Sequence, residues 1–275
     1  MTGKLRRLHR IRDGGKHPTI ITPLDDSLLA GPEHGLRDLG CKVAEVVEGQ
    51  PDAVIAFPGL LQRYERELKG IPTIVNLTAS TTVGCHTRKI LTSDVEEAVA
   101  LGADGVAVHV NITSLYEHEM LALLGRVNKE CSRFGMPLFA IMYPRREADG
   151  RDDNYEELRR SQPEAYAKLV RHAVRVGVEL GADLIKTQYT GSLDTFTTVI
   201  ASACGVPVFI AGGPLVDSSI ALRQAVDAVA AGAAGVSFGR NVFNRSSSTA
   251  MLKTLRMVID GAPLESAMAS NSLED

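Results

Sequence analysis

The residue in this sequence best suited to covalent chemistry is Lys186, which lies near the end of a short apolar run within the segment ADLIKTQYTG. A lysine is seldom buried, because its ammonium group loses hydration there, so this position calls for a reason. A desolvated lysine has a lowered pKa, and its neutral amine can attack a carbonyl carbon to form an imine. The alternative is a lysine that extends to the surface or pairs with a nearby carboxylate. The segment alone leaves both interpretations open.

Other polar side chains could assist an amine nucleophile, and each also has an ordinary structural interpretation. Tyr143 could donate and accept protons beside Lys186, or it could be an ordinary aromatic residue at the end of an apolar run. Asp25 could balance the charge of an iminium ion and move a substrate proton, whereas Asp26 could instead cap a helix or face solvent. His109 is the best histidine candidate, although a lone histidine at a strand end is more often a hydrogen-bonded structural residue.

A phosphate site is indicated by residues that follow the last two apolar runs. Gly212 and Gly213 follow one run, and Gly239 and Arg240 follow the other. Glycines let the backbone approach an anion closely, and an arginine adds a charge-assisted donor. The loops after strands seven and eight of many barrels hold phosphate in this way. The alternative is that the glycines form only a turn and that Arg240 is a surface residue.

These residues would be brought together by an alternation of short apolar runs and helical patterns, which is typical of βαβ units around a parallel sheet. The runs cover residues 19–24, 53–57, 73–77, 105–110, 138–142, 183–187, 206–211 and 234–238. The helical patterns lie near residues 36–48, 59–69, 92–101, 114–134, 163–180, 192–202, 217–231 and 247–260. This alternation predicts a closed (β/α)8 TIM barrel, whose active site would lie at the carboxyl ends of the strands. An open doubly wound sheet would also alternate, but its GxGxxG motif is absent from the first turn, where LDDSLLAGP stands.

The chain is predicted to form a single domain over residues 1–275. Leu5, Leu8 and Ile11 are spaced along one face of a helix, so we expect an N-terminal helix over 1–17 with its basic residues in solvent. Residues 145–162 are charged and almost free of apolar side chains, which predicts a long loop after the fifth strand. That loop would be either a lid or substrate-binding loop, or a mobile insertion. Residues 262–275 are expected to form a C-terminal tail.

Composition and charge argue against several classes of protein. The net charge of −3 lacks the basic excess expected of a protein that binds nucleic acid or anionic membrane. The basic N-terminus has no apolar run of the signal-peptide kind, and no segment approaches the roughly 20 apolar residues that span a bilayer. We therefore expect a soluble cytoplasmic protein. The four cysteines are scattered singly and the histidines show no close spacing, so reduced thiols and no metal site are expected.

Six segments in order carry a family resemblance: TIITPLDDSLLAGP, GVAVHVN, GMPLFAIMYPR, GADLIKTQYTG, VFIAGGP and AAGVSFGRNVF. Together they resemble the archaeal-type class I aldolase family, and within it the heptulosonate synthases and their relatives in aminohydroxybenzoate biosynthesis. The resemblance implies that Lys186 forms a Schiff base with a keto donor. It also implies that Tyr143 is the general acid and base, that Asp25 assists proton transfer, and that the glycines of the phosphate site and Arg240 hold the donor phosphate.

The resemblance further implies the substrates. The donor would be a phosphorylated ketone, either dihydroxyacetone phosphate or a deoxy-ketohexose phosphate, and the acceptor an aldehyde, L-aspartate 4-semialdehyde. The reaction would be an aldol addition or a transaldol exchange in aromatic amino acid or aminohydroxybenzoate-type biosynthesis, with no cofactor, in a homo-oligomer. Asp26, His109 and Arg145 are expected to contact substrate, and Asp26 and the Arg145-Arg146 pair could meet the charged groups of the acceptor.

One segment departs from the family pattern. Family members commonly have Asp-His-Gly where this chain has Asp25-Asp26-Ser27, so a carboxylate replaces an imidazole beside the substrates. This change leaves the substrates open. Three alternatives therefore remain: a class I fructose-bisphosphate aldolase, a coenzyme A-dependent thiolase acting on a phosphorylated diketone, and a non-catalytic phosphate-binding barrel.

Overall fold

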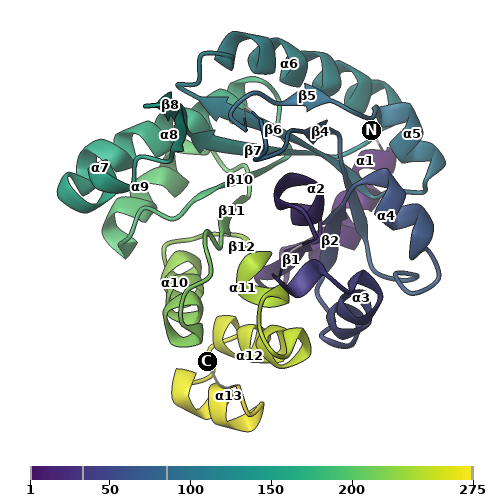
Figure 1. The fold of residues 1–275 in the computed structure, drawn as a ribbon, viewed down its shortest axis with the longest axis vertical. Helices are drawn as coiled ribbons and strands as arrows, with labels where there is room; N and C mark the ends of the chain where they lie inside the picture. Colours follow the sequence, from purple (N-terminus) through teal and green to yellow (C-terminus); the bar gives the residue numbers. More distant parts are fainter. Residues whose placement is uncertain (1, 33, 85, 274–275) are drawn as a thin grey trace.

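The computed structural model describes residues 2–32, 34–84 and 86–273, so Cys85 lies outside the described residues. Its barrel strands are β1 (Thr19–Pro23), β2 (Ala53–Ala56), β3 (Thr73–Asn76), β6 (Gly105–Ile112), β7 (Leu138–Pro144), β10 (Leu184–Gln188), β11 (Val208–Ala211) and β12 (Gly235–Ser237). They pair in parallel and close in the order β1-β12-β11-β10-β7-β6-β3-β2. Figure 1 shows the strands gathered in the middle of the molecule. The predicted (β/α)8 barrel is confirmed, and each apolar run supplies one strand.

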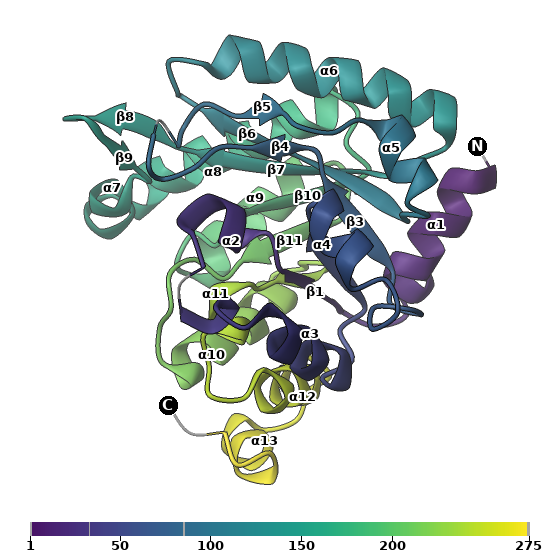
Figure 2. The same cartoon turned by 45° about the vertical axis from the view of Figure 1, so that its right-hand side comes forward.

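Helices connect successive strands and cover the outside of the barrel (Figures 1 and 2). Those that match the predicted patterns are α3 (Leu39–Glu48), α4 (Pro58–Arg63), α5 (Val95–Ala100), α6 (Glu117–Phe134), α8 (Pro163–Glu179), α9 (Leu193–Ser202), α10 (Ser218–Ala230) and α12 (Ser248–Ile259). The short helix η1 (Asp13–Gly15) lies within the expected N-terminal helix. The patterns did not predict η2 (His34–Leu36), α2 (Asp26–Ala30), α7 (Glu156–Ser161), α11 (Arg240–Phe243) and α13 (Leu264–Ser270). These elements are too short to show a clear helical period.

The helix α8 illustrates why these segments fold as they do. A proline occupies its first turn, where a missing N–H costs nothing, and Tyr166, Val170, Ala173 and Val174 form its buried stripe. That stripe packs against β7 and β10. The strand β7 is buried along its whole length, because a barrel strand is covered by side chains inside and by helices outside.

The N-terminal helix α1 (Thr2–Arg12) closes the barrel at the end opposite to the carboxyl ends of the strands. Ile11 is fully buried in the barrel interior, in one cluster with Phe139 and Phe209, whose rings meet edge to face at 5.4 Å. Leu8 packs against the same cluster, but Leu5 is 66% exposed, so the apolar face of this helix is narrower than expected. Apolar side chains therefore fill the barrel interior at the amino ends of the strands. The inward-facing positions at the carboxyl ends are left for polar residues.

Two small antiparallel hairpins are added at the carboxyl ends of the strands. One pairs β4 (Thr78–Ala79) with β5 (Ile90–Leu91), and the other pairs β8 (Arg146–Ala148) with β9 (Arg151–Asp153). The second turns at Asp149 and Gly150, both with positive φ, which is the geometry of a two-residue type I′ turn. Residues 145–162, expected as a loop, thus form a hairpin followed by α7. The Asp-Gly dipeptide was the available signal for this hairpin.

At the C-terminal end, residues 262–275 contain the helix α13, which packs against α12 and buries Ala267. Among residues 2–32, 34–84 and 86–273, no helix is long and apolar enough to cross a membrane.

Candidate active site

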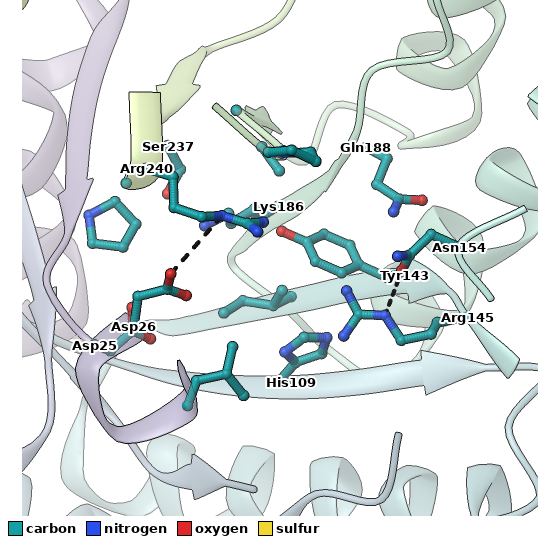
Figure 3. Close-up of a pocket in the computed structure, with 18 of the residues that line it drawn as sticks. Asp25, Asp26, His109, Tyr143, Arg145, Asn154, Lys186, Gln188, Ser237 and Arg240 are labelled. Carbon is teal, nitrogen blue, oxygen red and sulfur yellow. Dashed lines mark hydrogen bonds and ion pairs between the residues drawn. The ribbon is translucent and has the colours of Figure 1, made fainter. Parts of the chain in front are cut away.

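A pocket opens at the carboxyl ends of the barrel strands (Figure 3). All of the predicted site residues line it: Asp25, Asp26, His109, Tyr143, Arg145, Lys186, Gly212, Gly213, Gly239 and Arg240. Arg146 does not line the pocket, because its side chain turns to Asp153 in the β8–β9 hairpin, at 2.8 Å. The structure therefore gathers the predicted residues in one place, whereas their chemical roles stay predictions.

Lys186 faces the inside of the barrel, one layer above the apolar side chains that fill its interior. In register it pairs with Ile141 of β7 and Phe209 of β11, and it follows the buried Leu184 by two positions on β10. Strand residues two apart face the same side, so its side chain enters the pocket. Only 8% of the residue is exposed. Burial lowers the pKa of Lys186 to about 8, and nearby carboxylates only partly oppose this shift.

Asp25 is the main carboxylate that faces Lys186. It precedes α2 but makes no capping hydrogen bond to that helix, which leaves its carboxylate free to turn into the pocket. Burial raises the pKa of Asp25, while the charge of Lys186 and a hydrogen bond from Asn76 lower it. The Asn76 amide donates from Nδ2 to Asp25 Oδ2 at 2.7 Å. A buried acid and a buried amine thus act on each other's pKa: the charge of Lys186 lowers that of Asp25, and the charge of Asp25 raises that of Lys186.

Tyr143 and His109 come from neighbouring strands and pack edge to face. Their ring centroids are 4.9 Å apart, and the planes lie at 79°. Burial raises the pKa of the Tyr143 phenol, which keeps the phenol protonated. Burial also lowers the pKa of His109 well below its usual value, and its Nε2 has no hydrogen-bond partner among the described residues. A neutral imidazole with an unsatisfied buried nitrogen suits a hydrogen bond to substrate.

The loops after β11 and β12 are held together by Asn241. Its amide donates to the carbonyls of Gly212 and Pro214, at 2.8 and 2.9 Å, and its Oδ1 accepts from the backbone N–H of Val216 at 3.1 Å. A Cβ at Gly212 would lie 3.1 Å from the Phe238 ring, so this loop packs tightly against the ring and favours a glycine. The two loops form one rigid wall of the pocket.

Asp26 and Arg240 meet across the pocket mouth, with Oδ2 and Nε 3.9 Å apart, as the dashed line in Figure 3 marks. Asp26 therefore lies on the side of the predicted phosphate loops. Its expected contact with the acceptor stays a prediction.

Several polar residues of the pocket were not assigned a role from the sequence, among them Asn76, His86, Lys89 and Gln188. Gln188 follows Lys186 by two positions on β10, so strand alternation was a signal for it, and its Oε1 accepts from the Tyr166 hydroxyl at 2.6 Å. Asn76 ends the third strand, which was also a signal. His86 and Lys89 lie in a segment for which no element was predicted, and nothing in the sequence pointed to them.

No group of three or more histidine, cysteine, aspartate and glutamate side chains placed to hold a metal ion occurs in the part of the chain that the structure describes.

A buried lysine on the sixth strand of a (β/α)8 barrel, facing an aspartate and a tyrosine, is the arrangement of an aldolase that works through a lysine imine. The chain belongs to the DeoC/LacD family of aldolases, whose model matches residues 19–245. The family resemblance inferred from the six segments is confirmed, and the protein is a class I aldolase.

Two relatives and one solved structure illustrate the similarity. The 2-amino-3,7-dideoxy-D-threo-hept-6-ulosonate synthase 1 of Archaeoglobus fulgidus is 38% identical over 265 residues, covering 95% of this chain and 92% of the relative. The 2-amino-4,5-dihydroxy-6-oxo-7-(phosphonooxy)heptanoate synthase of Streptomyces griseus is 38% identical over 258 residues, covering 92% of this chain and 89% of the relative. An archaeal fructose-1,6-bisphosphate aldolase, with its catalytic lysine bound covalently to the carbinolamine intermediate of the substrate, superposes with a TM-score of 0.80 at 26% identity, covering 94% of this chain and all of the other.

Proposed function

We propose that this aldolase joins a phosphorylated ketone to an aldehyde through an imine on Lys186. The observation that carries the proposal is the buried amine of Lys186, whose pKa of about 8 leaves a substantial neutral fraction near neutral pH. A nucleophilic amine must be neutral, and burial supplies this at a position that faces Asp25.

The proposed reaction begins when the neutral Lys186 nitrogen attacks the ketone carbon and forms a carbinolamine. Loss of water gives an iminium ion, which withdraws electrons from the adjacent carbon. Removal of a proton from that carbon gives an enamine, and the enamine carbon then bonds to the aldehyde carbon. Tyr143 and Asp25 move the protons, because the protonated phenol can donate and the buried carboxylate can accept. Water finally hydrolyses the new imine and frees Lys186.

The donor phosphate is proposed to bind on the wall formed by Gly212, Gly213, Gly239 and Arg240. Gly213 has φ +69°, a conformation that glycine adopts without strain, and no atom lies within 4 Å of the position that a Cβ would take. Open space beside the backbone, with a half-exposed guanidinium nearby, suits a phosphate group.

The name of the Streptomyces griseus relative supports the choice of substrates. A 2-amino-4,5-dihydroxy-6-oxo-7-(phosphonooxy)heptanoate is a β-hydroxy ketone, which an aldol reaction forms by joining its carbons 4 and 5. The ketone half is then dihydroxyacetone phosphate, and the aldehyde half is L-aspartate 4-semialdehyde. We propose this pair for the present chain, with a deoxy-ketohexose phosphate as the alternative donor in a transaldol exchange.

Borohydride trapping tests the proposed lysine directly. Dihydroxyacetone phosphate with sodium borohydride should attach a reduced three-carbon adduct to Lys186, identified by peptide mapping. Lys186→Met should remove both the adduct and turnover, while the exposed-lysine variant Lys129→Met should retain them. An adduct on another lysine, or none, would overturn the proposed mechanism.

Two competing activities within this chemistry need separate assays. The structural similarity to fructose-1,6-bisphosphate aldolase keeps that activity as a candidate. Steady-state rates with glyceraldehyde 3-phosphate and with L-aspartate 4-semialdehyde distinguish the two. Product analysis with and without coenzyme A tests the thiolase alternative. The non-catalytic alternative is set aside, because the chain belongs to a family of enzymes.

A further inference from the structure

A second set of basic side chains lines the pocket outside the proposed imine chemistry. His86, Lys89 and Arg145 lie in contact with one another, and we call these three residues the basic cluster. Arg145 Nη1 lies 2.7 Å from His86 Nε2, and Lys89 Nζ lies 3.2 Å from His86 Nδ1. Lys89 also donates to Ser80 Oγ at 2.6 Å. The bond from the guanidinium makes His86 Nε2 an acceptor, so the proton of the neutral imidazole lies on Nδ1, from which it can be donated to Ser80 Oγ at 3.2 Å. The ring therefore lies between Arg145 and Lys89.

The two cations of the basic cluster are buried without a carboxylate partner. Lys89 is 5% exposed and Arg145 is 9% exposed. In the described ranges 2–32, 34–84 and 86–273, neither side chain forms an ion pair. Arg145 Nε donates to the neutral side-chain amide of Asn154, at Oδ1, over 2.6 Å. Two buried positive charges whose direct hydrogen-bond partners are neutral raise the free energy of the empty site, and the more distant carboxylate of Asp152 offsets this only in part. Consistently, burial and the charge of Arg145 lower the pKa of Lys89 to about 7.

The cluster is held in place by both accessory hairpins. His86 and Lys89 lie between β4 and β5, while Arg145 leads into β8. Besides the contact between Arg145 and His86, the Thr87 hydroxyl donates to the Glu147 carboxylate and thereby joins the two hairpins. The same carboxylate accepts from Ser114 Oγ at 2.9 Å. Donors that are already held in place lose little conformational entropy when a ligand binds, so the basic cluster is preorganised.

We infer that the basic cluster binds the anionic end of the acceptor aldehyde, with Lys89 and Arg145 as the charged contacts and His86 as the spacer between them. This inference rests on the proposed aldol function and adds the class of acceptor: a short aldehyde that ends in a carboxylate or a phosphate. The cluster arises from segments after β3 and β7, whereas the glycine loops follow β11 and β12. A donor phosphate on the glycine loops and an acceptor anion on the cluster would leave the two reacting carbons between them, near Lys186.

The test compares aldehydes that differ in the charge of their distal end. Rates with dihydroxyacetone phosphate are measured for succinic semialdehyde, glyceraldehyde 3-phosphate and uncharged glyceraldehyde. Lys89→Met keeps the length of the side chain and removes its charge, and Lys129→Met on the exposed face of α6 is the matched control. The ratio of kcat/KM for the anionic aldehydes to kcat/KM for glyceraldehyde should fall about 30-fold or more in Lys89→Met and stay constant in the control. The ratio is calculated separately for succinic semialdehyde and for glyceraldehyde 3-phosphate. The aldehyde whose ratio falls more in Lys89→Met shows whether the cluster prefers a carboxylate or a phosphate. A ratio that does not change would overturn the inference.

Asp152→Asn separates anion binding from a structural role of the cluster. Asp152 is an exposed residue whose carboxylate lies 3.8 Å from His86 Nε2, so it competes for the cluster with an incoming anion. If the cluster binds the acceptor, this variant should lower KM for anionic aldehydes. A rise in KM would indicate that Asp152 is a structural counter-charge and would contradict the inference.

Two measurements distinguish failure of this inference from failure of the proposed function. Borohydride trapping of dihydroxyacetone phosphate on Lys186 reports the imine chemistry and does not involve the acceptor. Calorimetric titration with inorganic phosphate needs no turnover: the unmodified protein should bind at two sites, and Lys89→Met and Arg240→Met should each lose a different one. Loss of the same site in both variants, or two-site binding retained in Lys89→Met, would contradict a separate anion site at the cluster.

Discussion

The amide of Asn76 donates from Nδ2 to Asp25 Oδ2 at 2.7 Å, and the orientation of that amide is itself fixed by Thr78. The backbone N–H and the hydroxyl of Thr78 both donate to Asn76 Oδ1, at 3.1 and 3.2 Å. Because the amide oxygen is occupied in this way, its NH2 group must face Asp25. The hydroxyl of Thr78 also accepts from the backbone N–H of His109 at 2.9 Å, so the positioning of Asp25 is tied to β6.

We therefore predict that Asn76 is a positioning residue for Asp25. Asn76→Ala removes a hydrogen bond that favours the ionised carboxylate, so the already raised pKa of Asp25 should rise further. The acidic limb of the kcat–pH profile should move to higher pH, and kcat at neutral pH should fall about 10- to 100-fold. Thr78→Val, which leaves the backbone donor in place, should cause a smaller shift. A loss of stability without a shift of the pH profile would mean that Asn76 has only a structural role.

Tyr143→Phe tests the proposed proton donor while keeping the edge-to-face packing on His109. We expect kcat to fall about 100- to 10,000-fold, the range for loss of a general acid or base. Because Lys186 is untouched, its borohydride adduct should still form. The measurement is single-turnover kinetics together with mass spectrometry of the trapped protein. A kcat close to that of the unmodified enzyme would exclude Tyr143 as the proton donor.

Lys186 should destabilise the folded protein below pH 8. Its pKa falls from 10.5 in the unfolded chain to about 8 in the folded protein, so the unfolded state holds more protons between these values. The contribution of this group to stability therefore rises as pH increases from about 8 to 10.5. At pH 7, Lys186→Met should raise the free energy of unfolding by about 1 to 3 kcal/mol.

Urea denaturation from pH 7 to pH 10 measures this effect. The difference between Lys186→Met and the unmodified protein should shrink as pH rises. The gain is partly offset because Asp25 loses a neighbouring positive charge, which raises its pKa further. A variant that is less stable than the unmodified protein at pH 7 would argue that Lys186 is a well-compensated structural charge.

Asn241→Ala should loosen the wall on which the donor phosphate is proposed to bind. The variant loses the hydrogen bonds to Gly212, Pro214 and Val216, which cross between two loops. We expect KM for dihydroxyacetone phosphate to rise about tenfold, and the free energy of unfolding to fall by about 1 to 3 kcal/mol. Asn271→Ala, in the segment that follows α13, is the control and should leave KM unchanged. If KM for dihydroxyacetone phosphate does not change in Asn241→Ala, these loops do not bind the donor.

The sequence predicted the barrel well because its strands are buried on both faces. Such strands appear as continuous apolar runs, and helices of ten or more residues between them show a clear stripe. The short elements were missed for the opposite reason. The β8–β9 hairpin and α7 are charged and partly exposed, so their burial pattern carries no period, and only the Asp-Gly turn marked the hairpin.

By itself, the sequence determined the class of fold, the family and the strand on which Lys186 lies, because each depends on local pattern and order along the chain. The tertiary structure decided what surrounds that lysine. Asn76 and Lys89 reach the pocket from distant segments, and the charges that shift the pKa of Lys186 come from other strands and loops. Electrostatic interactions act through space over a few ångströms, and residues far apart in the sequence reach such distances only when the barrel closes.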